Sequence, residues 1–454
     1  MAYCGYVTIL KNVRKHPNAD RLLLGECFGN TVCVSTDYTE GQIGVYFPTD
    51  GQLSVEFAEQ NNLLRKKDEN GNNIGGYMDP DKRNVTSIKL RGEKSDGLFL
   101  PLSCLDYTGT KELQVGDQIT VVNRHEICQK YIPKRKISNP NPKGNKVRKK
   151  KVPVAPLFIE HADTEQLAYN LDAFKYGDLI EITLKMHGTS QRTAYVPKLH
   201  HYKRTILDRI LRREGTPVYE WGYVTGTRRT VLNDYDGGYY GSDTFREPHA
   251  KFFEGKLHKG EEVYYEVVGF TTTGQPIMGD ANNKKLNDKD FVKQYGETTR
   301  FSYGCEPTGK MAMYGRDDIG YFEILSKVPQ SDFYVYRMTM TNEDGDVIEY
   351  TPDYMRYRCE QMGCKCVPRL WHGYLECDSS IPPGERIRSI AESFYDGPDP
   401  IGKTHIREGV VVRIVNRPKF TAYKHKNWYF KALEGIVKVD ADAPDMEEAQ
   451  EIQE

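Results

Sequence analysis

The chain has 454 residues, a formal net charge of −1 and ten cysteines scattered along its length. This length allows two or three domains with a core each, and the balanced charge excludes a wholly basic or wholly acidic protein. The start of the chain lacks an apolar signal segment, and no stretch has the apolar length of a membrane span. We therefore expect a cytoplasmic protein, in a host cell if the gene is viral, with no membrane partner.

Short strands dominate the first 128 residues, separated by Gly, Asn and Asp. The segments are GYVTIL, LLLGECF, TVCVS, IGVYF, VTSIKL and GLFLPL. One helix is predicted in SVEFAEQNNLLR, with Ser54 as its N-cap. Many short strands with a single helix predict a small β-barrel over residues 1–128.

Two stretches of this region, HPNADRLLLGEC and IKLRGEKSDGLFLPL, resemble the OB-fold module that synthetases carry as a tRNA-binding appendage. The resemblance implies that the barrel binds nucleic acid through a basic face that also bears aromatic side chains. The alternative is a barrel that only supports the domain beside it.

A basic segment follows the barrel. No Asp or Glu occurs between Glu126 and Glu160, while ten Lys and Arg residues do. Together with its Pro and Asn residues, this composition predicts a flexible linker over residues 129–153, or less commonly a phosphate-binding tract. Residues 154–440 mix predicted strands and helices in one further domain, and an acidic tail over residues 441–454 follows it.

The segment DLIEITLKMHGTSQR carries the main chemical signal. Its apolar residues alternate along one face of a predicted strand: Ile180, Ile182 and Leu184. Lys185 then lies on the opposite face with Glu181, and the strand breaks at Gly188, where the backbone can approach a phosphate closely. A lysine attacks only as the neutral amine, which nearby positive charge or a metal ion favours. Taken alone, such a lysine is more often solvated and inert.

The same segment, with HADTEQL before it, resembles the lysine motif of RNA ligases in the covalent nucleotidyltransferase superfamily. Five later stretches resemble the remaining motifs of that superfamily in their order: VTGTRRTVL with Arg228, EVYYEVVGF with Glu266, FYVYRM with Tyr336, REGVVVRIV with Glu408, and FTAYKHKNWYF with Lys424 and Lys426. Six ordered motifs make chance agreement improbable.

The resemblance implies four catalytic residues. Lys185 would attack the α-phosphate of ATP and carry AMP, while Lys424 and Lys426 would hold that phosphate. Lys424 and Lys426 lie two residues apart on a predicted strand, so their side chains point to the same face. Glu408 would contribute to a site for Mg²⁺ or Mn²⁺.

The resemblance also implies contacts to the nucleotide from His187, Gly188, Arg228, Glu266 and Tyr336. Glu266 would hold the ribose and Tyr336 would stack on the adenine. Many members of the superfamily have Asp in place of His187, so a direct metal contact is less expected here. Some RNA ligases share this histidine, which favours an RNA substrate over DNA. For both carboxylates, the alternative is a structural ion pair.

Domain order refines the prediction. Too few residues follow Lys426 for the carboxy-terminal OB domain of DNA ligases and capping enzymes. An OB domain in front resembles the nick-sealing RNA ligases of the Deinococcus and Naegleria type. The predicted fold is α+β, with an OB-fold barrel followed by an ATP-grasp-like nucleotidyltransferase domain of antiparallel sheets and helices. We expect a monomer that uses ATP to join a 3′-OH RNA end to a 5′-phosphate end in nicked duplexes.

Two alternatives stay open for the function. An mRNA-capping guanylyltransferase would use the same lysine with GTP. A non-catalytic tRNA-binding module would explain the barrel alone.

A cluster of possible metal ligands occurs late in the chain: Cys359, Cys364, Cys366, His372 and Cys377. Its spacing lacks the paired C-x2-C knuckles of strong zinc motifs. TPDYMRYRCEQMG instead predicts a helix with Thr351 as N-cap and Gly363 at its end, which places Cys359 in the core.

The segment HHYKRTILDRILRREG predicts a short helix with Ile206, Ile210 and Leu211 facing inward. Its outer face would hold Lys and Arg residues, exposed to solvent or in contact with nucleic-acid phosphates.

Overall fold

A computed structural model describes most of the chain. The described residues are 3–49, 51–67, 73–110, 112–131, 154–161, 164–211, 213, 215–232, 235, 240, 242–278, 286, 288–296, 300–308, 311–312, 326–377, 380–402, 405–433 and 437–438. Most of the predicted linker and the whole acidic tail lie outside these residues. The chain divides into two compact units, Met1–Pro142 with Leu286–Val292 and Lys431–Glu454, and Lys143–Lys285 with Lys293–Phe430.

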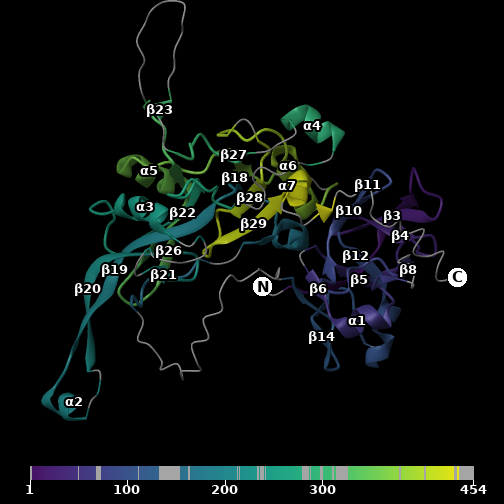
Figure 1. Ribbon diagram of the computed structural model, residues 1–454, viewed down its shortest axis with the longest axis horizontal. Coiled ribbons are helices and arrows are strands. Elements are labelled where there is room, and N and C mark those ends of the chain that lie inside the picture. The colour runs from purple at the N-terminus through teal and green to yellow at the C-terminus, as the bar shows by residue number, and fades with distance from the viewer. Residues whose placement is uncertain are drawn as a thin grey trace, which may run out of the picture. The chain divides into compact units, whose positions relative to one another are not determined.

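The first unit consists of short strands, antiparallel except for the parallel pair β10 and β30, with one α-helix near its start (Figure 1). Its largest sheet has the order β12–β5–β1–β13, from β1 (Gly5–Ile9), β5 (Ile43–Phe47), β12 (Leu98–Pro101) and β13 (Gln118–Ile119). Its three-stranded sheets are β2 (Lys11–Lys15), β3 (Leu22–Cys27) and β4 (Asn30–Ser35); β16 (Cys128–Lys130), β6 (Gly51–Leu53) and β9 (Asn84–Val85); and β11 (Glu93–Ser95), β10 (Ser87–Leu90) and β30 (Val437–Lys438). Two further pairs are β7 (Lys66–Lys67) with β8 (Asn73–Gly75), and β14 (Val121–Val122) with β15 (His125–Glu126).

All six strands predicted in this region are confirmed. Helix α1 (Val55–Gln60) is also confirmed, because the Ser54 side chain accepts a hydrogen bond from the Phe57 amide. Phe57 is buried against Phe47, with ring centroids 5.2 Å apart, in the core of this unit. Closure of these sheets into an OB barrel stays a prediction.

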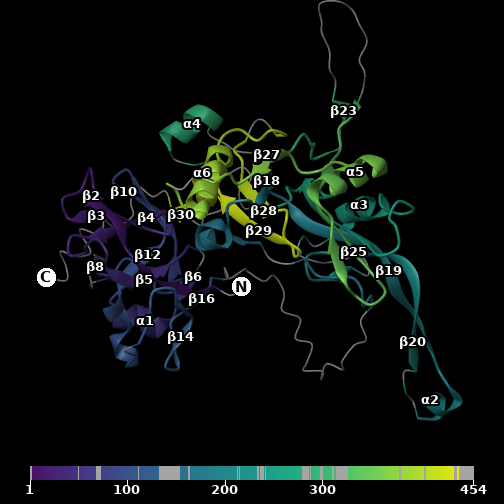
Figure 2. The ribbon, with the colours of Figure 1, turned by 180° about the vertical axis from the view of Figure 1, so that it is seen from behind.

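The second unit is built on two sheets (Figures 1 and 2). The five-stranded sheet has the order β17 (Glu165–Gln166), β29 (Thr421–Lys426), β28 (Gly409–Ile414), β18 (Leu179–Lys185), β27 (Arg369–Tyr374). The six-stranded sheet has the order β21 (Val231–Leu232), β20 (Thr216–Gly226), β19 (Thr189–Lys203), β22 (Glu261–Gly269), β25 (Ser331–Thr341), β26 (Val347–Glu349). All neighbours pair antiparallel except β17 and β29. The mixed α+β architecture is therefore confirmed. A separate pair joins β23 (Met311–Ala312) to β24 (Ser326–Lys327).

The chain passes from the five-stranded sheet to the six-stranded sheet at a short turn. Strand β18 ends at Lys185, and β19 begins at Thr189 in the other sheet. The predicted alternation in β18 is confirmed, since its three apolar side chains are buried in the core: Ile180, Ile182 and Leu184. The turn therefore sets Lys185 at the end of a strand that is fixed by its buried face.

Helices cover both sheets. They are α3 (Glu247–Lys251), α5 (Pro352–Met362), α6 (Pro383–Tyr395) and α7 (Trp428–Leu433). Short 3₁₀ turns of this unit lie at Leu167–Tyr169, Leu171–Ala173 and Thr244–Arg246, and the first unit has one at Leu102–Thr108. Helix α4 (Lys289–Tyr295) has residues in both units. Ile387 and Ala391 of α6 pack on the five-stranded sheet. None of the described helices is both long and apolar enough to cross a lipid bilayer.

Helix α5 matches its prediction. The Thr351 side chain accepts from the Tyr354 amide, and Gly363 ends the helix in the left-handed conformation that favours glycine. Cys359 is buried beside Met355 in the core of the six-stranded sheet, as predicted. No group of three or more possible ligands that could hold a metal ion occurs among the described residues, these cysteines included.

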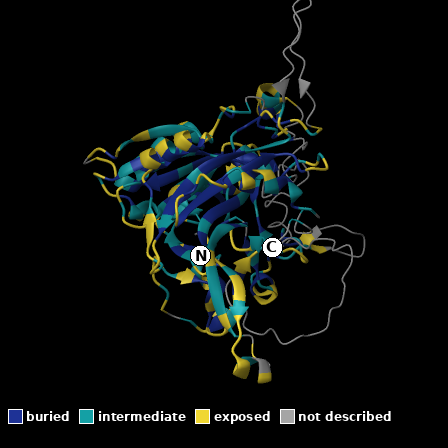
Figure 3. Ribbon diagram, turned by 90° about the vertical axis from the view of Figure 1, so that its left-hand side faces the viewer, coloured by how far each residue is buried: buried dark blue, intermediate teal, exposed yellow. Residues whose placement is uncertain are grey.

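The outer part of β19 and β20 leaves the sheet as a two-stranded arm, and α2 (Ile206–Ile210) lies at its tip (Figure 1). The prediction that the apolar residues of this helix face inward is wrong. Ile206, Ile210 and Leu211 are 77%, 70% and 54% exposed. The amphipathic pattern requires a neighbouring surface to cover it, and the arm carries the helix away from the rest of its unit (Figure 3).

Candidate active site

A cavity of about 200 Å³ in the second unit is lined by residues from both sheets. Strands β18, β28 and β29 supply one wall, and β22 and β25 supply another. The cavity brings together six residues that the sequence singled out: Lys185, Arg228, Glu266, Tyr336, Lys424 and Lys426. Their roles remain predictions, but their convergence from five separate segments is a property of the fold.

The Lys185 ammonium contacts the buried carboxylate of Glu408, with Nζ 2.5 Å from Oε1. Lys426 reaches the same oxygen at 3.4 Å, so one carboxylate is shared by two cations. Burial alone would raise the pKa of Glu408, but Lys185 and Lys426 outweigh it and hold that pKa far below the ordinary value. Glu408 is therefore ionised at neutral pH and fixes both lysines at the cavity wall.

His187 lies behind this carboxylate and is buried. Its Nδ1 is 3.6 Å from Glu408, and its Nε2 donates to the Met278 carbonyl oxygen at 3.0 Å. The ring packs against Phe301 and Phe430, with centroids 5.0 and 4.8 Å away. His187 is not among the cavity-lining residues. In this position it supports Glu408, which in turn pairs with the cavity-lining Lys185 and Lys426.

Gly188 packs directly against β22. A Cβ atom at this position would lie 2.4 Å from the Val267 carbonyl oxygen and 2.8 Å from Cγ of Glu266. Glycine is thus required by the close approach of the turn to the strand that carries Glu266. The sequence predicted that the backbone at Gly188 approaches a phosphate closely. In the structure, the group that packs closely against Gly188 is strand β22.

Glu266 is half-buried on β22, opposite Ser190 of β19. Burial raises its pKa to about 7, Lys185 and Arg228 counteract that rise, and repulsion from Glu408 adds to it. Glu266 lines the cavity, whereas Glu408 is not a lining residue and pairs with Lys185, and the two carboxylates repel each other. A divalent cation would relieve this repulsion, and Mg²⁺ or Mn²⁺ often combines one or two carboxylates with phosphate oxygens. The residues present fit a metal that arrives with a phosphate ligand.

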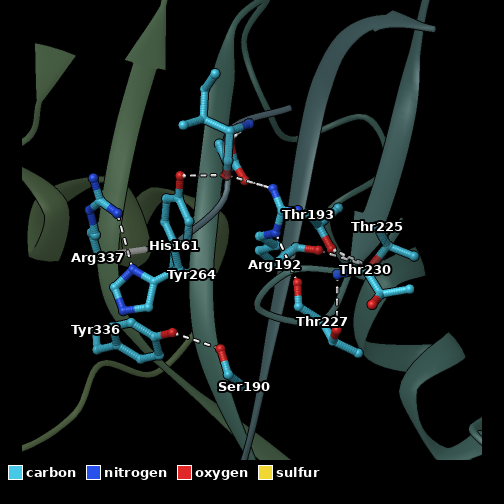
Figure 4. A network of polar contacts seen from close by, with 12 residues as sticks. His161, Ser190, Arg192, Thr193, Thr225, Thr227, Thr230, Tyr264, Tyr336 and Arg337 are labelled. Carbon is cyan, nitrogen blue, oxygen red and sulfur yellow. Dashed lines mark hydrogen bonds and ion pairs between the residues drawn. The ribbon is translucent and has the colours of Figure 1, made fainter. Parts of the chain in front are cut away.

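Tyr336 is the extra residue of a β-bulge. Tyr264 pairs with Arg337 and Tyr265 pairs with Val335, which leaves Tyr336 without a partner in the register. Bulges re-aim side chains near functional sites. The Tyr336 hydroxyl and the Ser190 hydroxyl are hydrogen-bonded at 2.9 Å, which positions the ring at the cavity (Figure 4).

Arg337 forms an ion pair with Glu349. It also donates to Nδ1 of His161 at 3.0 Å (Figure 4). His161 lines the cavity, and its ring centroid is 5.3 Å from that of Tyr336. Arg337 therefore supports an aromatic wall of the cavity through His161. The histidine belongs to the HADTEQL stretch, but sequence reasoning did not single it out.

Sequence reasoning also missed a buried pair beneath the cavity. Arg192 donates to the Thr227 carbonyl oxygen at 2.9 Å (Figure 4). It also donates to Glu262 at 3.0 Å, and its guanidinium lies over the Phe158 ring. Burial raises the pKa of Glu262 to about 7 against the lowering effect of Arg192. The pair links the segments that carry His161 and Arg228. A charged residue within a strand core was its only sequence signal.

Lys424 and Lys426 lie on one face of β29 and both line the cavity, as their spacing predicted. Arg228 follows β20 in a turn and lines the same cavity. Glu181 of β18 also lines the cavity, and it accepts from Arg356 at 3.1 Å and from Arg369 at 2.8 Å. Its charge is therefore neutralised within the protein.

Comparison with solved structures identifies the class of fold as that of an RNA ligase. Similar structures include those of Naegleria gruberi RNA ligase. A variant with AMP and Mn has a TM-score of 0.54 at 16% identity, covering 95% of this chain and 98% of that chain. A variant with ATP and Mn has a TM-score of 0.53 at 16% identity, covering 95% and 98%. The ligase with PPi has a TM-score of 0.53 at 16% identity, covering 94% and 97%. No protein-family model and no curated protein sequence matches the chain.

Proposed function

We propose that this protein is an ATP-dependent RNA ligase that forms lysyl-AMP on Lys185. The observation that carries the proposal is the position of the Lys185 amine. It lies at the wall of a cavity that also presents two further lysines, the Glu266 carboxylate and a tyrosine ring, and it pairs with the buried Glu408. The Naegleria gruberi structures of this fold contain ATP, AMP, PPi and Mn.

In the first step, Lys185 gives up its proton and its Nζ attacks the α-phosphorus of ATP. The new N–P bond forms as the bond to the pyrophosphate oxygen breaks. Lys424 and Lys426 hold the α-phosphate, and Arg228 contributes a further positive charge. Gly188 allows the close turn that brings Lys185 beside Glu266. A bound Mg²⁺ or Mn²⁺ would be held by Glu408 or Glu266 with phosphate oxygens, and would neutralise charge on the transferring group.

Recognition of the nucleotide follows from the other wall. Tyr336 stacks on the adenine, and Glu266 accepts from the ribose hydroxyls. His187 keeps Glu408 in place. After adenylation, AMP passes from Lys185 to a 5′-phosphate RNA end, and a 3′-OH then displaces AMP to form the phosphodiester bond. We assign these RNA steps to nicks in duplexes, and we assign the front barrel (residues 1–128) and the basic linker (residues 129–153) to holding the RNA.

Mass measurement of the full chain tests the proposal. Incubation with ATP and Mn²⁺ or Mg²⁺ should add one AMP that is stable to alkali and lost in acid, as a phosphoramidate is. Lys185→Ala should abolish the adduct. An adduct that persists in Lys185→Ala would place the nucleophile elsewhere. An adduct formed with GTP instead of ATP would favour a guanylyltransferase, and a chain that forms neither adduct would favour a non-catalytic binding protein.

A further inference from the structure

The arm formed by β19 and β20 is the one long projection of the second unit among the described residues (Figure 1). Strand β19 leaves the site turn and pairs with β22 only from Thr189 to Ala194. Beyond Ala194 it pairs only with β20, out to Lys203 and Thr216. At roughly 3.3 Å per residue, these nine further residues extend about 30 Å. The inner part of this stretch packs on its unit, because Val196 is buried with Ala155 and Phe158 and the Leu199 amide donates to the Val154 carbonyl oxygen at 2.7 Å. Beyond Leu199 the strand pairs with β20 alone, and a two-stranded ribbon is marginally stable by itself, which suggests that this outer half serves to reach a partner.

The register of the arm places its aromatic side chains on one face. Residues directly opposite share a face, so Tyr195 with Tyr223, Leu199 with Tyr219, and Tyr202 with Pro217 are same-face pairs. The register shifts by one residue between Leu199 and His201. Because of this bulge, Tyr202 pairs with Pro217 and lies on the same face as Leu199 and Tyr219. The outer rings of Tyr202 and Tyr219 are only partly buried. Tyr195 and Tyr223 pack against the core of the six-stranded sheet, so the outer half of the face offers the rings of Tyr202 and Tyr219.

The opposite face and the tip carry positive charge. Residues 195–223 contain six Lys and Arg residues against three Asp and Glu residues, whereas the whole chain has a net charge of −1. Asp208 accepts from Thr205 and Glu220 contacts His200, so two of the acidic groups are engaged locally. Lys198, Lys203 and Arg213 are exposed. Aromatic rings beside basic side chains are typical of nucleic-acid binding.

We propose that the outer half of this arm binds RNA beside the sealing site, with bases stacked on its aromatic face and phosphates held by its basic side chains. The inference rests on the proposed ligase function. The exposed Ile206, Leu207 and Ile210 of α2 would pack on base edges or sugars at the end of the bound segment. A second copy of the chain is the weaker choice of occupant. A tip helix of five residues offers far less than the area of about 1,000 Å² that a stable protein interface needs.

RNA binding by the full chain tests the proposal. A labelled nicked RNA duplex is titrated at fixed salt with the wild type, with Tyr202→Ala/Tyr219→Ala and with Ile206→Ser/Leu207→Ser/Ile210→Ser. Each lost stacking contact should weaken binding about 10-fold. Lysyl-AMP formation from ATP should not change, because the cavity residues are untouched. Tyr374→Ala, which removes an aromatic side chain 63% exposed on β27, is the matched control and should bind like the wild type.

Charge removal gives a second readout. Lys198→Gln/Lys203→Gln/Arg213→Gln should flatten the salt dependence of RNA binding by about 0.7 to 0.9 for each lost phosphate contact. Unchanged RNA affinity in both the aromatic and the charge variants would overturn the proposal. A wild type that dimerises through α2, with RNA affinity unchanged in the α2 variant, would also overturn it. Failure of the wild type to form lysyl-AMP would refute the ligase function separately, because RNA binding is measured without ATP.

Discussion

Glu266 should make the stability of this protein fall as the pH rises toward neutrality. Its pKa is raised from 4.5 to about 7 in the folded state, mainly by burial. Between these values the folded state binds more protons than the unfolded state, so the free energy of unfolding decreases with increasing pH. A rise of about 2.5 pKa units, at 1.36 kcal/mol for each unit, means that full ionisation of Glu266 lowers the free energy of unfolding by about 3 kcal/mol. The penalty is absent below about pH 4.5 and complete above about pH 7.

The assay compares wild type with Glu266→Gln by urea unfolding at several pH values from 5 to 8. The neutral amide has no penalty to acquire, so the variant should gain stability relative to wild type by up to about 3 kcal/mol as the pH rises. Glu262 titrates in the same range but is present in both proteins, so the difference curve isolates Glu266. Glu254→Gln, at an exposed carboxylate, should give a curve parallel to wild type. A flat difference between Glu266→Gln and wild type would refute the reasoning.

Three further predictions concern the site and the linker. Gly188→Ala should destabilise the protein by about 1–3 kcal/mol and lower adenylation, because the added Cβ would clash with β22. Urea unfolding measures the stability and AMP incorporation measures adenylation. Wild-type values in both assays would contradict the close packing of Gly188 on β22. Lys426→Ala should lower the rate of adenylation by about 100-fold or more. Its thermal midpoint should stay near that of the wild type, because Lys185 still neutralises Glu408. Lys419→Ala is the exposed control, and a large drop in the midpoint of Lys426→Ala would mean that Lys426 has a structural role. Replacing Lys149, Lys150 and Lys151 by Ser should reduce the salt dependence of RNA binding and leave AMP incorporation intact, and an unchanged slope would exclude phosphate contacts from these lysines.

Local features of the fold were predictable because their causes are local. The alternation of β18 and the caps of α5 depend on residues a few positions apart, and both were confirmed. The sequence indicated that Lys185 and Glu408 lie near each other only because both belong to the ordered motifs. No spacing rule relates residues so far apart in the chain. The Arg192–Glu262 pair lacked even that signal. The exposed Ile206 shows the reverse case, in which a local pattern predicts burial but the tertiary structure supplies no covering surface.

The passage of the chain between its two sheets within three residues has a consequence for how such proteins can diverge. The cavity depends on where a few strands end beside the turn from Met186 to Gly188. Lengthening a strand at its far end, as in the arm, leaves that junction unaltered. Insertions and surface changes can therefore accumulate outward from the junction, and chains can retain one fold and one arrangement of site residues while sharing few amino acids elsewhere. An identity of 16% over nearly the full length of a structural counterpart is the outcome such an architecture permits.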